Sequence, residues 1–265
     1  ISWDAAFKHI GKKLKQLNSP DEAVFYTSGR TSNEAAFLYQ LFVRQFGTNN
    51  LPDCSNMCHE STGTGLSRTI GIGKGTVKLE DFYVADLIMV IGQNPGTNHP
   101  RMLSALQKAK RKGAKIITVN PLEETAFKKF KNPQEIRGWI GKGTTISDLF
   151  LQVKINGDLA LLKAIMCVLL EMEDENPETV FSKDFITKQT KGYKALVADL
   201  RMQNVSALAA NCGIPLEEIR QAAELIRDNQ RMIICWAMGI TQHENGVDNV
   251  QEIVNLLLLR GSIGI

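Results

Sequence analysis

Residues 87–100 read LIMVIGQNPGTNHP, an uninterrupted apolar run that ends in a glycine-rich turn. Five consecutive apolar residues are typical of a strand that is buried on both faces, as in a parallel sheet. Gly92 begins the turn, and Pro100 suits the first turn of a following helix. The stretch therefore predicts a strand over 87–91 and, after the turn, a helix over 100–112.

The same alternation continues on both sides of this stretch. Further apolar segments that predict strands lie at 23–27, 115–119, 149–155 and 232–237. Helical spacing of apolar residues, with plausible caps, occurs over 2–17, 34–46, 61–69, 158–172, 193–202, 215–228 and 247–260. Because buried strands alternate with amphipathic helices, the pattern predicts an α/β fold, a Rossmann-like parallel sheet with helices on both faces.

The composition is that of an ordinary globular protein, with 43% of the 265 residues hydrophobic and 22% charged. This excludes disordered, collagenous and coiled-coil proteins. At roughly 100 to 200 residues per domain, the length favours two domains. The net charge of +3, from 31 basic and 28 acidic residues, is too small to indicate a nucleic-acid partner. No apolar run approaches the roughly 18 residues of a membrane span, so none is expected.

The five cysteines are too few for a disulfide scaffold, and their odd number favours reduced thiols and a cytoplasmic protein. Three of them lie in apolar or helix-ending contexts that are typical of structural thiols: Cys167, Cys212 and Cys235. Cys54 and Cys58 instead lie in the polar stretch DCSNMCHESTGTG, which makes this stretch a candidate site.

His59 directly follows Cys58, shortly before the helix expected over 61–69. A thiolate in this position could bind a soft metal ion. Other interpretations stay open, because a mid-chain Cys-His pair is often incidental and a papain-like nucleophile would need a distant histidine.

Loops that could bind a ligand follow the predicted strands. In a parallel sheet, ligands bind beyond the carboxyl ends of the strands, where backbone amides and helix amino termini face anionic groups. The loop over 92–99, which contains Asn94, Pro95, Asn98 and His99, could approach a diphosphate closely. A glycine-rich turn without a ligand explains it equally well.

Three further loops carry polar side chains. Asn120 and Glu123 follow the strand over 115–119, where a nucleotide ribose would be held, although a capped turn is also possible. Asp158 opens a helix and could accept hydrogen bonds from N1–H and N2–H of guanine, but helix capping is the commoner role of such an Asp. The fourth loop spans 238–243.

Five longer segments resemble a known family: ISWDAAF, FYTSGRTSNEAAFLYQLFVRQFGTNN, NMCHESTGTGL, GQNPGTNHPRM and GITQHENGVDNVQEIVNLLLLRGSIG. They are similar to segments of the molybdopterin oxidoreductase family, and more narrowly to its formate dehydrogenase-like alpha subunits. The resemblance extends over the whole chain. It implies a molybdenum or tungsten atom held by two molybdopterin guanine dinucleotides and one protein ligand.

The resemblance also implies roles for individual residues. Cys58 matches the metal ligand, His59 is the nearest proton acceptor, and Asn50 matches an asparagine upstream of the ligand. The segment from Gly92 to His99 matches the one that holds the diphosphate. Asn120 stands where the family often has Asp before Pro, Asp158 matches a guanine-facing Asp, and a GxxQH loop near the pterin is matched by Gly239, Gln242 and His243.

The resemblance further implies a domain organisation. Residues 1–53 would be part of a first α/β domain, 54–260 most of a Rossmann-like cofactor-binding domain, and 261–265 a return toward the first. The family places an iron–sulfur region before the equivalent of Ile1. The chain would therefore be a central fragment that is inactive alone, with a small-molecule substrate and a redox partner subunit.

Three functions remain open on the sequence alone. The first is two-electron oxidoreduction at a molybdenum centre. The second is a cofactor-free scaffold in an electron-transfer complex, against which the presence of Cys58 and the four loops argues. The third is a nucleotide-binding module, which needs only the loops at Gly92 and Asp158 and leaves Cys58 unexplained.

Overall fold

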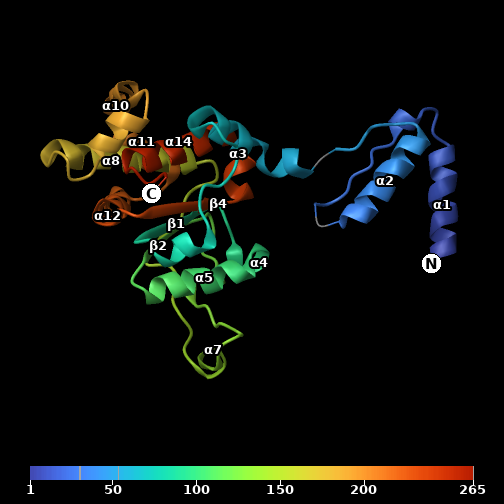
Figure 1. Cartoon of the computed structure of the whole chain (residues 1–265), viewed down its shortest axis with the longest axis horizontal. Coiled ribbons are helices and arrows are strands. Elements are labelled where there is room, and N and C mark those ends of the chain that lie inside the picture. Colours follow the sequence, from blue (N-terminus) through green and yellow to red (C-terminus); the bar gives the residue numbers. More distant parts are fainter. Residues whose placement is uncertain (30, 53, 265) are drawn as a thin grey trace. The chain divides into compact units, whose positions relative to one another are not determined.

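The computed structural model describes residues 1–29, 31–52 and 54–264. The chain divides into two compact units, Ile1–Glu60 and Ser61–Ile265 (Figure 1). Each unit has its own packing, and each is described separately below.

The first unit consists of helix α1 (Trp3–Lys15), the short turn η1 (Pro20–Glu22), helix α2 (Asn33–Phe46) and the beginning of α3. Ser2 and Ser32 cap α1 and α2, since each hydroxyl accepts a hydrogen bond from a backbone N–H in the first turn. Both predicted helices of this region are confirmed.

The strand expected over 23–27 is not formed. The segment is extended, and its Phe25 N–H donates to Asn50 O at 2.9 Å. Side chains supply further donors to its backbone, from Asn50 to Ala23 O and from Tyr39 to Tyr26 O. The described residues of this unit contain no strand that could pair with it. The Phe25 ring instead packs edge-on against three aromatic rings of α2, those of Tyr39, Phe42 and Phe46. Phe25, one of the apolar residues that suggested a strand, therefore packs against α2.

The second unit is built on a four-stranded sheet in the order β3-β2-β1-β4. Its strands are β1 (Leu87–Ile91), β2 (Lys115–Val119), β3 (Leu149–Leu151) and β4 (Met232–Trp236). All three pairings are parallel. The predicted α/β fold with a parallel sheet is confirmed, although β3 is shorter than the apolar segment over 149–155 suggested.

Each connection between two strands contains at least one helix, as the crossover between parallel strands usually does. The short helix η2 (Leu79–Tyr83) precedes β1. The connections between strands contain α4 (Pro95–Asn98), α5 (Pro100–Arg111), α6 (Thr125–Lys128), α7 (Ile136–Ile140), α8 (Asp158–Glu175), α9 (Lys183–Gln189), α10 (Tyr193–Met202), α11 (Val205–Cys212) and α12 (Leu216–Asp228). After β4 come α13 (Met238–Thr241) and α14 (Gly246–Leu259).

Helices cover both faces of the sheet (Figure 1). On one face, Leu87 and Met89 belong to the larger apolar core, to which α8, α12 and α14 contribute. On the other face, Ile88 and Val90 pack in a smaller core with apolar residues of α5. Because successive strand residues point to opposite faces, a strand buried on both sides needs the unbroken apolar run seen in β1.

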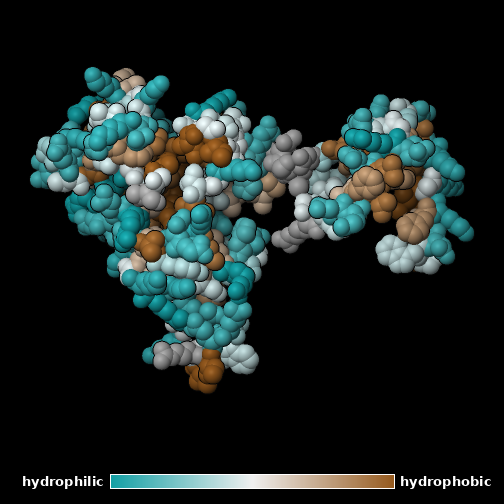
Figure 2. Space-filling model, in the orientation of Figure 1, coloured by the Kyte–Doolittle hydropathy of each residue, from teal (hydrophilic) through white to brown (hydrophobic). Residues whose placement is uncertain are grey.

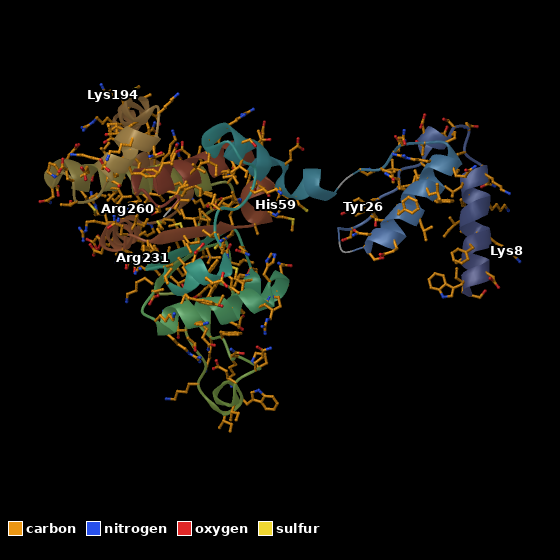
Figure 3. The ribbon with its side chains drawn as sticks, in the orientation of Figure 1. Lys8, Tyr26, His59, Lys194, Arg231 and Arg260 are labelled. Atoms are coloured by element: carbon orange, nitrogen blue, oxygen red, sulfur yellow. The ribbon has the colours of Figure 1, made fainter. Side chains whose placement is uncertain are left out.

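Ion pairing and buried hydrogen bonds fix the amino-terminal edge of the sheet. Arg231, just before β4, contacts Asp86, just before β1, through two guanidinium nitrogens at 2.6 and 3.0 Å. Arg260 is buried at the end of α14 and donates to the backbone carbonyls of Val180 and Arg227. Both arginines lie on this second unit (Figure 3).

Helix α3 (Cys54–Ile70) is longer than the helix expected over 61–69, and a non-helical backbone at His59 (φ −137°, ψ 17°) interrupts it. Its later part packs closely on α14. A Cβ atom on Gly65 would lie 2.8 Å from Val250 Cγ1. The close approach explains why glycine stands at a helix-interior position.

Several large apolar side chains are exposed. Figure 2 shows an apolar patch at the end of the loop that carries α7, where Ile136, Trp139 and Ile140 are exposed. Within the described part of the chain, no helix combines the length and apolar character needed to cross a membrane.

Two glycine substitutions in α3 test the packing of this helix on α14. Gly65→Ala should destabilise the fold by about 1 to 3 kcal/mol, because the added methyl group overpacks the contact with Val250. Gly63→Ala is the matched control, since a Cβ there meets nothing within 4 Å. It should be neutral or stabilise by about 0.5 to 1 kcal/mol. Denaturant unfolding of both variants checks this, and equal effects would contradict the close packing.

Candidate functional site

Loops from several parts of the second unit meet at the carboxyl edge of the sheet and enclose a hollow of about 380 Å³. They follow β1, β2, β3 and β4. The hollow is lined by Gly92, Gln93, Asn94, Asn120, Pro121, Ile155, Asp158, Met238, Gly239, Gln242 and His243. Gly92, Asn120 and Asp158 were expected at one edge of the sheet, and the structure brings them together there.

The loops after β1 and β4 touch through backbone atoms at Gly92 and Gly239. Gly239 N–H donates to Gly92 O at 3.1 Å. A Cβ on Gly239 would lie 2.6 Å from Gly92 O, and one on Gly92 would lie 2.8 Å from Gly239 C. Gly92 also has φ +59°, in the left-handed region that favours glycine. Any larger side chain would therefore separate the two loops.

Asn120 joins the loops after β1 and β2. Its side-chain amide donates to Gln93 O at 2.9 Å, and its backbone N–H donates to Leu151 O at 3.2 Å. The side chain is buried. An aspartate could not donate the first of these bonds, so the amide has a structural use at this position.

Gln93 was not singled out by the sequence analysis. Its side chain is 8% exposed, and its Nε2 lies 3.2 Å from His99 Nδ1 and 3.4 Å from Met102 Sδ. Among the described residues, none makes a hydrogen bond to Gln93 Oε1, which is buried. A buried acceptor without a donor is costly, and a donor on a bound molecule or water would satisfy it. The sequence signal for Gln93 was the position of a polar residue directly after the buried strand β1 and Gly92.

The rest of the predicted loop over 92–99 shapes the turn. Asn94 Oδ1 accepts from Thr97 N at 3.1 Å and so caps α4, and Pro95 is buried in its first turn. Asn98 and His99 are exposed. Pro95, Asn98 and His99 do not line the hollow.

Glu123 also lies outside the hollow. It is exposed and pairs with Lys128 of α6. The sequence pattern placed it after β2 correctly, but the chain beyond Pro121 turns away from the hollow's lining.

Asp158 and His243 are the titratable groups that line the hollow. Asp158 is the first residue of α8 and is 4% exposed, while Gly157 holds the cap position without a side-chain capping bond. Burial raises the pKa of Asp158 to about 6, partly opposed by His243 and by its own backbone N–H. The carboxyl thus lies in the first turn of α8, where it interacts with a backbone N–H and also faces the hollow.

His243 is held in place by its own loop. Its Nε2 lies 2.7 Å from Gly239 O, and a carbonyl oxygen only accepts, so Nε2–H is the donor. The same nitrogen lies 3.9 Å from Asp158 Oδ2. The imidazole thus fixes the loop after β4 and places a group that can carry positive charge beside the buried carboxyl.

Asn249 of α14 supports the loop after β4 through a hydrogen bond, a role that the sequence pattern did not reveal. Its side chain is fully buried in α14, and its Nδ2 donates to Ile240 O at 3.2 Å. Met238 and Gln242 are exposed at the rim of the hollow. A polar residue on the apolar face of a helix was the sequence signal for Asn249.

Cys58 and His59 belong to the first unit, as does Asn50. Cys58 is half-buried within α3, and His59 is exposed at the interruption of the helix. Asn50 donates from Nδ2 to Asp21 O at 2.8 Å and to Ala23 O at 3.2 Å. The side chain of Cys54 lies outside the described part of the structure. Among the described residues, no three His, Cys, Asp or Glu side chains gather as a metal site would require.

A buried carboxyl with a raised pKa should lower the stability of the protein near neutral pH. The folded-state pKa of Asp158 lies above its ordinary value of 3.8, so folding is favoured below pH 4 and this contribution is lost as pH rises through about 6. Asp158→Asn should therefore match the wild type at pH 4. At pH 7.5 it should be more stable by up to about 3 kcal/mol, from about two pKa units.

Urea unfolding at both pH values measures this effect. Asp184→Asn is the control, because Asp184 is exposed on α9 and should change stability by less than about 0.5 kcal/mol. An Asp158→Asn variant that loses stability at pH 7.5 would contradict the burial argument.

Comparison with known proteins supplies a family and several relatives. The family model described as molybdopterin oxidoreductase matches residues 1–265. An uncharacterized oxidoreductase of Mycobacterium bovis is 52% identical over 264 residues, covering 100% of this chain and 34% of the relative. Protein YdeP of Escherichia coli strain K12 is 46% identical over 269 residues, covering 100% of this chain and 35% of YdeP.

More distant proteins agree with these matches. The F420-dependent formate dehydrogenase subunit alpha of Methanocaldococcus jannaschii is 31% identical over 264 residues, covering 99% of this chain and 36% of that subunit. The chain spans about a third of the length of the curated relatives it matches. Acetylene hydratase from Pelobacter acetylenicus has a similar fold, with a TM-score of 0.68 at 19% identity, over 100% of this chain and 33% of that protein.

Proposed function

The chain belongs to the molybdopterin oxidoreductase family, and from that premise we propose that it is part of the catalytic subunit of a two-electron oxidoreductase. The cofactor would be molybdenum or tungsten held by molybdopterin guanine dinucleotides. A formate dehydrogenase-like reaction, with a redox partner subunit that exchanges the electrons, is the form of this function that we favour. Its support is the similarity to a formate dehydrogenase alpha subunit.

The observation that carries the proposal is the hollow at the carboxyl edge of the sheet. Its residues fit a nucleotide-containing group. The contact between Gly92 and Gly239 leaves backbone rather than side chains at the centre of the edge, as close approach of a diphosphate requires. Gln93 Oε1 is a buried acceptor that a ligand donor could satisfy. Asp158 is a buried carboxyl at a helix start.

Asp158 would recognise the base of the nucleotide. A carboxylate accepts two hydrogen bonds at once, and guanine offers N1–H and N2–H side by side, whereas adenine has no such donor pair. Selectivity would then arise from the cost of leaving a buried acceptor without donors when adenine binds.

Cys58 and His59 would serve the reacting centre. When bound, the metal supplies two-electron redox chemistry by cycling between oxidised and doubly reduced states. The Cys58 thiolate would be the protein ligand, since soft sulfur ligands donate electron density to such a metal. His59 follows Cys58 in the sequence and is exposed. Its imidazole would accept the proton released by the substrate.

Replacing Cys58 tests the metal-ligand role. In the full-length protein, Cys58→Ala should abolish turnover and reduce the bound molybdenum or tungsten, because the variant lacks the ligand sulfur. The thermal midpoint should change little, since a half-buried thiol leaves no large cavity. Metal analysis by mass spectrometry and a melting curve give both readouts.

Cys54→Ala is the matched control and should keep both metal and activity. Equal losses in the two variants would mean that the cysteines act jointly. A wild-type protein without either metal would favour the cofactor-free scaffold instead.

Nucleotide preference tests the role of Asp158. The full-length protein, prepared without cofactor, should bind GDP at pH 7.5 about tenfold or more tightly than ADP, because only guanine satisfies the carboxylate. Asp158→Ala should bind the two nucleotides equally. Isothermal titration calorimetry measures all four affinities, and equal affinities in the wild type would remove the guanine site from the proposal.

A further inference from the structure

The guanine site depends on a carboxyl that is buried and has one titratable neighbour in the described lining of its hollow. Among the described residues, the lining of the hollow contains no lysine or arginine, and its titratable members are Asp158 and His243. The side chains of Asp158 and His243 are 6% and 16% exposed. A charge on either group therefore acts on the other through little water.

His243 lies beside Asp158 without bonding to it directly. Its Nε2–H donates to Gly239 O at 2.7 Å and not to the carboxyl. Its Nε2 lies 3.9 Å from Asp158 Oδ2, which is beyond hydrogen-bond distance but well within the range of electrostatic attraction. The imidazole therefore influences Asp158 by charge and not by donating a hydrogen bond to it.

The side chains of Cys212 and Lys154 lie near Asp158 but are not among the groups that lower its pKa. Cys212, from α11, lies close to the start of α8, where a Cβ on Gly157 would come within 2.9 Å of Cys212 Cα. Burial raises the pKa of the Cys212 thiol, so it stays neutral at the pH values considered. Lys154 directs its Nζ to Ala210 O at 3.1 Å and does not line the hollow. The positive end of α8 favours a negative Asp158 as well.

We propose that His243 is a positioning residue whose imidazolium charge keeps Asp158 ionised, and so extends guanine binding by this hollow to lower pH. The proposal rests on the guanine site proposed above and adds its regulation by pH. Only the ionised carboxyl can accept both guanine hydrogen bonds, so binding must displace the proton from any Asp158 that carries one. A protonated His243 opposes that protonation.

The direction of the pH effect follows from this linkage. Since the pKa of Asp158 is about 6, guanine affinity should be nearly constant above pH 7. It should fall about tenfold for each pH unit well below 6. Without the imidazole, guanine affinity should begin to fall at a higher pH. Burial would then raise the pKa of Asp158 without an opposing positive charge.

The test is the ratio of GDP to ADP affinity between pH 5 and pH 8, measured by calorimetry on the cofactor-free, full-length protein. The two nucleotides carry the same phosphates, so the ratio cancels the ionisation of the ligand. We expect the wild-type ratio to decline about tenfold from pH 7 to pH 5. The decline should start at higher pH in His243→Gln, which keeps an amide donor for Gly239 O but has no charge. It should start at lower pH in His243→Lys.

Asp158→Asn is the control without a titrating carboxyl. Its ratio of GDP to ADP affinity should not change with pH. A wild-type ratio near one at every pH would defeat the guanine site itself. A clear preference for GDP that does not vary with pH would overturn the inference and leave the guanine site standing. So would a decline at the same pH in His243→Gln and His243→Lys, because His243 would then serve only as an anchor of its loop.

Discussion

The contact between the backbones of Gly92 and Gly239 is the constraint on which the site depends. It joins the loop after the first strand to the loop after the last, where a single Cβ would force them apart. The adjacency of β1 and β4 in the sheet makes the contact possible, and Asn249 holds the second loop from below through Ile240 O. Both glycines line the hollow where these two loops meet. Asp158 and Asn120 then complete it from the neighbouring connections.

The sheet could be predicted because its signals are local. Largely apolar runs mark β1, β2 and β4, and parallel pairing follows from the helices between them. The segment over 23–27 carries the same kind of signal but forms no strand, because pairing depends on a neighbour that a local pattern does not reveal. Its Phe25 packs on α2 instead.

The candidate site was predictable in outline and not in detail. The rule that ligands bind at the carboxyl ends of parallel strands was enough to bring Gly92, Asn120 and Asp158 together. It could not exclude Glu123, which follows the same strand as Asn120 but pairs with Lys128 away from the hollow. The unsatisfied acceptor on Gln93 and the spacing between Asp158 and His243 depend on side-chain geometry across loops, which no periodicity encodes.

Asp158 is a buried carboxyl, which we expect to lower stability at neutral pH, and perturbed groups of this kind are typical of functional sites. The central claim is that this ligand is the guanine end of a molybdopterin cofactor. The most direct measurement is to denature the purified full-length protein and quantify the metal and the nucleotides it releases after mild acid hydrolysis. The account predicts molybdenum or tungsten together with guanine nucleotide. A protein that releases neither metal, or that releases metal with a different nucleotide, would contradict it.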